Sequence, residues 1–191
     1  MSRLRRGVHV EAGFSLIEVL VSVSLMSVVM AIAGGSIVNA MQAQRKQVER
    51  TDTVNDMTIA FERVSTELRG ADPVQNASGT TVTAVVPQAN QTTTTTFTLV
   101  SVGAGLHRLD ATTTVQDTVA GTTTSTRVLL DRLTDNAGNG IFTYFDAAGA
   151  TLAAPIVESQ VHRVRMRLVV DLPELTDTID ISNDIVVRNA G

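Results

Sequence analysis

The sequence predicts an α+β fold in which one long N-terminal helix, partly membrane-spanning and partly amphipathic, packs on a C-terminal antiparallel β-sheet domain. Three observations predict it: an apolar run without proline at residues 14–38, an apolar stripe of helical period after it, and a change to threonine, valine and glycine after Pro73. The 191 residues include no cysteine, which excludes disulfides, thiolate metal sites and cysteine catalysis.

Residues 14–38 are long enough to span a membrane as a helix, because at about 1.5 Å per residue the run crosses a hydrocarbon core of roughly 30 Å. Arg3, Arg5 and Arg6 precede it, and Glu18 is the one charge within it. The positive-inside rule keeps the N-terminus in the cytoplasm. We therefore expect a single-pass protein of the cell membrane whose C-terminal domain is extracytoplasmic.

Two simpler interpretations compete for this segment. A secretory signal has an apolar region of only about 7 to 15 residues that ends in a small-residue cleavage site. Here the small residue, Gly13, precedes the run. A plain uncleaved anchor explains everything except Glu18, whose carboxylate costs roughly 2.5 kcal/mol or more in the apolar layer unless it is paired. Glu18 is therefore a candidate functional residue.

The segment 13–20, GFSLIEVL, follows a short basic leader and resembles the class III signal of type IV prepilins and of the pseudopilins of type II secretion and competence systems. The resemblance implies that a membrane prepilin peptidase cuts between Gly13 and Phe14, removes the leader 1–13 and methylates the new amino group of Phe14. It also implies partners: membrane lipid, other pilin or pseudopilin subunits, and an inner-membrane assembly platform. A pilus or a pseudopilus is the expected destination.

The chemistry of these residues agrees with the resemblance. Glycine at the cut gives an extended, unobstructed backbone that a protease site accepts. Cleavage before Phe14 creates an ammonium group at the start of an apolar helix, and Glu18 of a neighbouring subunit can neutralise it. Such a pair would set the axial register of an assembly while apolar surfaces supply the adhesion.

A glycine pair, Gly34 and Gly35, interrupts the apolar run where the family often has a helix-breaking proline. In a helix each glycine costs about 1 kcal/mol relative to alanine, so the pair can permit local unwinding. It can equally form a small-residue notch for helix packing. The sequence leaves both interpretations open.

The helix is expected to continue through residues 39–71 as an amphipathic segment. Its apolar stripe has spacings of three and four residues and consists of Val54, Met57, Phe61, Val64 and Leu68. Arg69 in the last turn, then Gly70 and Pro73, predict its end. The stripe is short for a coiled coil, which favours packing against a sheet of the same chain.

Residues 72–191 are predicted to form a threonine-rich β domain, because β-branched residues interrupted by glycine and asparagine indicate short strands and turns. The candidate strands are 81–86, 95–102, 106–110, 127–130, 141–145, 161–170 and 178–188. Threonine runs also occur in loops, and residues 116–125 are interpreted as a long loop.

The last two strands are predicted to pair as a hairpin with one apolar and one charged face. If a two-residue turn at 173–174 joins them, Arg167 lies opposite Asp180 and Arg163 lies opposite Asp184. An arginine row also suits DNA phosphates. The facing aspartates and the net charge of -4, which becomes more negative without the leader, argue against DNA as a partner.

Metal, cofactor and catalytic sites are not indicated. The segment from Asp135 to Asp146 loosely follows a calcium-loop spacing, but Ala137 occupies a ligand position, so a turn led by Asn139-Gly140 is favoured. The three histidines are scattered, and no nucleophile elbow, phosphate loop or paired-carboxylate motif stands out. We therefore expect no cofactor and interpret the chain as an enzyme's substrate rather than as an enzyme.

A second, less specific resemblance concerns the last third of the chain. The segments FTYFDAAGATL, RVRMRLVV and ISNDIVVRN follow an order similar to that of minor pilins and J-type pseudopilins. The lack of a C-terminal cysteine pair and the size fit a minor subunit better than a major pilin. The sequence thus indicates a minor pilin or pseudopilin, with a membrane-anchored binding module or adhesin outside any filament as the alternative.

Overall fold

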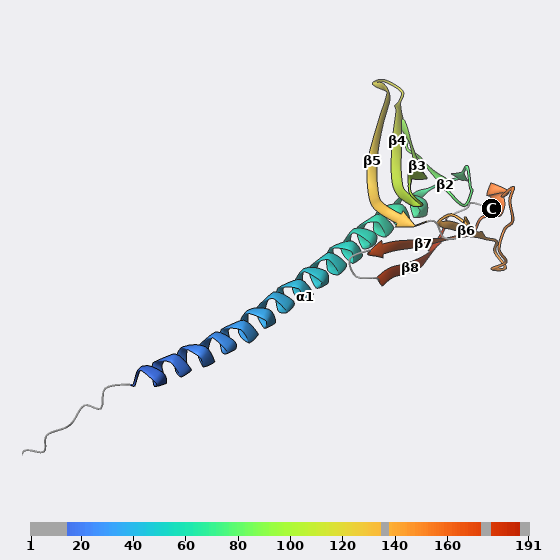
Figure 1. Cartoon of the computed structure of the whole chain (residues 1–191). Coiled ribbons are helices and arrows are strands. Elements are labelled where there is room, and N and C mark those ends of the chain that lie inside the picture. Colours follow the sequence, from blue (N-terminus) through green and yellow to red (C-terminus); the bar gives the residue numbers. More distant parts are fainter. Residues whose placement is uncertain (1–14, 135–137, 173–176, 188–191) are drawn as a thin grey trace, which may run out of the picture. The chain divides into compact units, whose positions relative to one another are not determined.

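The computed structural model of the protein describes residues 15–134, 138–172 and 177–187. Within these ranges the chain forms a long helix, a sheet of eight strands and a short 3-10 turn (Figure 1). The chain divides into two compact units, Met1–Gln47 and Val48–Gly191. The elements are α1 (Leu16–Gly70), β1 (Val74–Gln75), β2 (Thr81–Pro87), β3 (Gln91–Gly103), β4 (Leu106–Asp117), β5 (Gly121–Thr134), β6 (Phe142–Phe145), η1 (Glu158–Gln160), β7 (Arg163–Leu172) and β8 (Asp177–Val186).

The predicted α+β architecture is confirmed. All strand pairs are antiparallel, and the sheet follows the order β1-β2-β3-β4-β5-β7-β6, with β8 also paired to β7. Because β8 pairs along the whole of β7, the strands β5 and β6 share the other edge of β7. The sheet therefore has a long meander, β2 to β5, and a smaller part, β6 to β8, joined where Leu133 pairs with Val170.

Strand β5 belongs to both parts because it bends. Its pairing with β4 shifts register twice, on either side of the Leu109–Leu130 pair. In the second irregularity Arg132 has a φ of 61°, a left-handed conformation that is uncommon outside glycine. Extra residues of this kind bend a strand and increase its twist, so the end of β5 can turn toward β7.

The threonine runs are strands, and the interpretation of residues 116–125 as a long loop is wrong. Strand β4 continues to Asp117 and β5 begins at Gly121, so only residues 118–120 form the turn. Threonine hydroxyls bond across these strands, at 3.0 Å for Thr112–Thr126 and 3.2 Å for Thr114–Thr124. The composition that suggested a loop therefore forms a regular cross-strand ladder.

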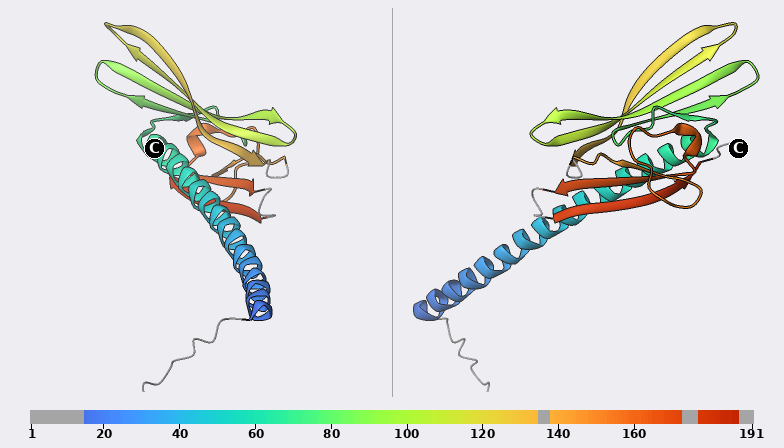
Figure 2. Two further views of the ribbon diagram at one scale, coloured as in Figure 1. Left: turned by 60° about the vertical axis from the view of Figure 1, so that its left-hand side comes forward. Right: turned by 90° about the vertical axis from the view of Figure 1, so that its right-hand side faces the viewer.

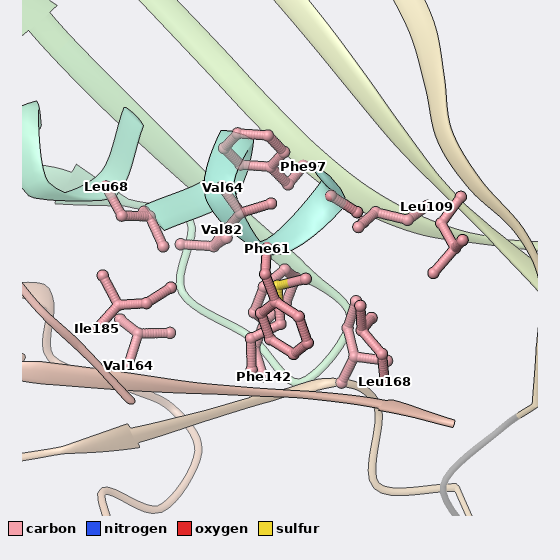
Figure 3. Close-up of a cluster of buried hydrophobic side chains, with 14 of the residues drawn as sticks. Phe61, Val64, Leu68, Val82, Phe97, Leu109, Phe142, Val164, Leu168 and Ile185 are labelled. Atoms are coloured by element: carbon pink, nitrogen blue, oxygen red, sulfur yellow. The ribbon is translucent and has the colours of Figure 1, made fainter. Parts of the chain in front are cut away.

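The second half of α1 supplies the centre of the core, as the apolar stripe predicted. Met57, Phe61, Val64 and Leu68 are buried and Val54 is partly buried. Figure 3 shows the helix side chains lying between two groups of strands. The labelled residues are Phe61, Val64 and Leu68 of α1, Val82, Phe97 and Leu109 of β2 to β4, and Phe142, Val164, Leu168 and Ile185 of β6 to β8.

A backbone contact ties the start of β2 to β6. The carbonyl of Gly79 accepts hydrogen bonds from the N–H groups of Ile141 (2.8 Å) and Phe142 (3.0 Å). A Cβ atom at Gly140 would overlap this carbonyl, and Gly140 also has a φ of 70°. Glycine is therefore required at position 140 for two independent reasons.

The predicted register of the last hairpin is wrong by two residues. In the structure Arg165 lies opposite Asp184, Arg167 lies opposite Ser182, and Leu172 lies opposite Asp177. The connection thus spans residues 173–176, which lie outside the described residues, instead of two residues. A shift of two keeps every side chain on its predicted face, so the apolar pattern alone does not distinguish the two registers.

Candidate processing and assembly segment

The helix begins directly after the residues that resemble a cleavage site. The carbonyl of Ser15 accepts the first helical hydrogen bonds, from the N–H groups of Glu18 (3.0 Å) and Val19 (3.2 Å). Its hydroxyl accepts the N–H of Ile17 at 3.3 Å, so Ser15 caps the helix. Gly13, Phe14, Arg3, Arg5 and Arg6 lie outside the described residues.

Ser15 is a helix-capping residue that was not predicted from the sequence. Its spacing to Glu18 is that of a capping box, a serine followed three residues later by glutamate, and this signal was present in the sequence. A negative charge in the first turn also interacts favourably with the positive end of the helix dipole. Glu18 is therefore favourably placed at the start of the helix, although its carboxylate makes no hydrogen bond to the cap.

The carboxylate of Glu18 is exposed in the first turn of α1. Among residues 15–134, 138–172 and 177–187 it has no ion pair and no hydrogen bond. In an apolar layer, a carboxylate without a partner is costly. A group outside the described chain, such as the amino group of a neighbouring subunit, is therefore a physically suitable partner.

The first unit presents its apolar side chains outward. All described residues of this unit, 15–47, are exposed, and the helix is long and apolar enough to cross a membrane by length and composition. Its polar hydroxyls are satisfied internally: Ser22, Ser24, Ser27 and Ser36 donate to carbonyls three or four residues earlier at 2.7 to 3.0 Å. The segment is thus suited to an apolar environment, which the chain itself does not provide.

Gly34 and Gly35 lie within the continuous helix α1. A Cβ atom added at either position would meet no other described atom within 4 Å. Neither glycine is needed for packing inside the described chain, so both the unwinding interpretation and the helix-packing interpretation stay predictions.

The charged face of the last hairpin carries ion pairs. Arg165 binds Asp184 through two bonds, Nε to Oδ1 at 2.6 Å and a terminal nitrogen to Oδ2 at 3.0 Å. Arg167 binds Asp180 in the same manner, with its shortest contact at 2.6 Å, and Arg163 lies 3.4 Å from Asp184. The pairs 163–184 and 167–180 therefore form diagonally, not between directly opposed residues as predicted.

Hydrogen bonds from the guanidinium groups hold the pKa of Asp184 and the pKa of Asp180 below the ordinary value. The same bonds raise the pKa of Arg165 and the pKa of Arg167. Arg163 and Arg165 also lie over the ring of Phe145, at 4.5 and 5.0 Å from its centre. The arginine row is thus engaged in contacts within the domain.

The remaining candidate, the calcium-like segment, is only partly described, because Asp135 and Ala137 lie outside the described residues. Asp146 accepts a hydrogen bond from the N–H of Ala150 at 2.8 Å, so its carboxylate stabilises a turn. In the described ranges, no group of three or more histidine, aspartate or glutamate side chains is placed to hold a metal ion.

The chain thus combines an antiparallel sheet domain with an N-terminal helix that is long and apolar enough to span a membrane. A comparison with protein-family models matches residues 9–34 to the prokaryotic N-terminal methylation motif. The chain therefore carries the prepilin-type N-terminal methylation motif of type IV pilin-like proteins at residues 9–34, and the match leaves the β domain uncovered. No curated protein and no solved structure shows a significant match to the chain.

The motif has direct consequences for processing and location. It implies cleavage by a prepilin peptidase and assembly with other pilins, and together with the apolar helix it supports anchoring in a membrane. Proteins with this motif are structural subunits of pilus systems rather than enzymes.

Proposed function

We propose that the chain is a minor pilin or pseudopilin that is stored in the membrane and assembled into a type IV pilus, a competence pilus or a type II secretion pseudopilus. In the proposed orientation the N-terminus is cytoplasmic and the domain, residues 72–191, is extracytoplasmic. The β domain extends the filament surface at or near a tip, and the helix forms the filament core.

The observation that carries this proposal is Glu18. It lies five residues after Gly13 in a matched methylation motif, and its carboxylate has no partner among the described residues. Cleavage before Phe14 supplies a cation at the start of the helix. A pair between this cation and Glu18 of a neighbour removes two isolated charges from the apolar layer at once.

The first test is the N-terminus of the membrane-extracted protein, measured by intact and peptide mass spectrometry with and without an active prepilin peptidase. We expect a peptidase-dependent N-terminus at Phe14, with one methyl group on its nitrogen. A leader that persists beside an active peptidase would contradict the proposal and favour a tethered binding module or adhesin.

The second test separates the charge of Glu18 from its position in the helix cap. Glu18→Gln keeps a side chain that a capping box accepts but removes the charge, whereas Glu18→Ala removes both. We expect both variants to be cleaved and to be lost from sheared filaments. Glu62→Gln, the same change at an exposed position of α1, is the matched control. Normal incorporation of both Glu18 variants would refute the pairing.

A further inference from the structure

One edge of the sheet is open along β5. Residues 121–128 pair with β4 on one side, and the pairing of β5 with β7 starts only at Leu133. Among the described residues no strand covers the other edge of this stretch, and all of its residues are exposed. Figures 1 and 2 show the yellow to orange β5 at the margin of the β2–β5 meander.

The open edge lacks the features that keep sheet edges apart. Protected edges carry proline, lysine, inward charges or a bulge. The stretch 121–128, GTTTSTRV, has no proline or lysine and one charge, Arg127, and the register shifts of β5 begin only beyond Val128. Backbone N–H and C=O groups on this side are therefore available to another strand.

We propose that this edge pairs with the same edge of a second copy of the chain, antiparallel and about a two-fold axis at Thr124. The sequence is self-complementary in this register. Thr122 lies opposite Thr126 of the second copy, Thr123 opposite Ser125, and Thr124 opposite itself. Within the sheet Thr126 and Thr124 already bond through their hydroxyls to Thr112 and Thr114 of β4, so pairs of the same kind would continue this threonine ladder across the interface.

The opposite charges of Arg127 and Asp117 favour the same register. It places Arg127 of the second copy opposite Gly121, and Gly121 in turn lies opposite Asp117 in β4. Because Gly121 has no side chain, the guanidinium of Arg127 from the second copy can extend over it toward Asp117. The Cα atoms of Arg127 and Asp117 are about 10 Å apart in this arrangement, which is the width of two strand spacings. Within the described ranges Arg127 has no ion pair, and the two-fold axis creates two such pairs.

The proposed register also places two exposed apolar residues, Val119 and Val128, beside the second copy. Val119, at the tip of the β4–β5 turn, is 93% exposed, and Val128 is 45% exposed. Around the two-fold axis the turn of one copy lies level with the Val128 end of β5 in the other. Both valines are then near apolar neighbours instead of water.

The chain has no cysteine, so the register can be tested with single cysteines in the full-length protein in detergent under mild oxidation. We expect Thr124→Cys to form a disulfide-linked dimer, because opposed Cα atoms in a sheet lie within disulfide reach. Thr122→Cys and Thr126→Cys should cross-link poorly alone but efficiently when mixed. Val157→Cys, at a position 53% exposed and outside the sheet, is the control.

Two results would overturn the proposal. One is Thr124→Cys cross-linking no better than Val157→Cys. The other is a mixture of Thr122→Cys and Thr126→Cys that cross-links no better than either variant alone, which would indicate another register or contact through the membrane helix.

A second measurement does not depend on cysteine chemistry. Thr124→Lys opposes two like charges at the axis and should weaken dimerisation by about tenfold or more in sedimentation experiments. Thr66→Lys, on the exposed side of α1, should leave it unchanged. An unchanged association in Thr124→Lys contradicts the pairing. None of these substitutions lies in the matched motif, residues 9–34, so we expect cleavage at Gly13 to be unaffected in every case, and this inference can fail without the proposed function failing.

Discussion

At the scale of single residues, Tyr144 illustrates how a polar group is held in the core. Its side chain is 1% exposed, and its hydroxyl donates toward the carbonyls of Ser78 (2.9 Å) and Thr81 (3.0 Å). Tyrosine is well suited here because its ring fills the core while its hydroxyl satisfies backbone acceptors. This contact and the Gly79 contact together attach the start of β2 to β6.

Tyr144 also gives a prediction for alkaline pH. Burial raises the pKa of its hydroxyl above the ordinary value of about 10. Because the unfolded chain ionises first, the contribution of this group to stability is complete below about pH 10 and is lost as the pH rises further. The chain has one tyrosine and no tryptophan, so absorbance at 295 nm reports this residue alone.

We expect the 295 nm titration of the folded protein to coincide with alkaline unfolding measured by circular dichroism. Ionisation near pH ~10 with the fold intact would show that the hydroxyl is accessible to water. Tyr144→Phe should lower the free energy of unfolding by about 1 to 3 kcal/mol, because the part-buried carbonyl of Ser78 loses its donor, whereas the carbonyl of Thr81 keeps the N–H of Ser78.

At the scale of elements, the ion pairs of β7 and β8 predict the acid behaviour of the domain. The pKa values of Asp180 and Asp184 are lowered by their arginine partners. Their stabilising contribution is therefore complete above about pH 4, the range of an unfolded aspartate, and is lost as the pH falls further. Both pairs are open to solvent, which screens them, so each contributes little to the stability.

Asp184→Asn tests this directly, since Asp184 contacts both Arg163 and Arg165. We expect a slightly lower thermal midpoint than wild type at pH ~7 and no difference near pH ~2, where the wild-type carboxylate is protonated. Asp56→Asn, which removes an exposed carboxylate of α1, is the control. An equal loss at both pH values would mean that the aspartate acts through packing.

How far the sequence predicts the elements depends on the kind of signal. The helix and its buried stripe were predictable because Met57, Phe61, Val64 and Leu68 repeat with the period of one helix face. The lengths of β3 to β5 were not, because threonine is common in both strands and loops. In the last hairpin, apolar and charged residues alternate with a period of two. This alternation predicts the face on which each side chain lies, but it does not distinguish registers that differ by two residues.

The same distinction applies to the candidate site. The motif around Gly13 and Glu18 could be recognised in the sequence because processing depends on specific residues at a fixed spacing. The diagonal pairing of Arg167 with Asp180 and the bend of β5 at Arg132 depend on loop length and on contacts distant in sequence. No local pattern encodes such contacts.

At the scale of the whole molecule, the two units obtain their stability from different sources. In the first unit all described residues are exposed, whereas α1 has buried side chains from Met57 onward. The first unit therefore needs an apolar environment supplied by lipid or by other subunits. The second unit has its own hydrophobic core, and the buried stripe of α1 is part of that core.

This difference predicts that folding of the domain and processing of the N-terminus are separable. Leu68→Ala removes a fully buried side chain and should destabilise the second unit by about 2 to 5 kcal/mol. Ile59→Ala, on the same helix but at a position 60% exposed, should change it by less than about 0.5 kcal/mol. Limited proteolysis and thermal unfolding measure the domain, and mass spectrometry of the N-terminus measures processing.

We expect Leu68→Ala to lose protease resistance in the β domain while its leader is still removed at Gly13, because the cleavage site and the apolar run 14–38 belong to the first unit and Leu68 belongs to the second. A Leu68→Ala chain that keeps its leader would show that the peptidase requires a folded domain, and the two units would then be coupled before assembly. If Ile59→Ala were as damaging as Leu68→Ala, the exposed side of α1 would have a partner that the single chain does not contain.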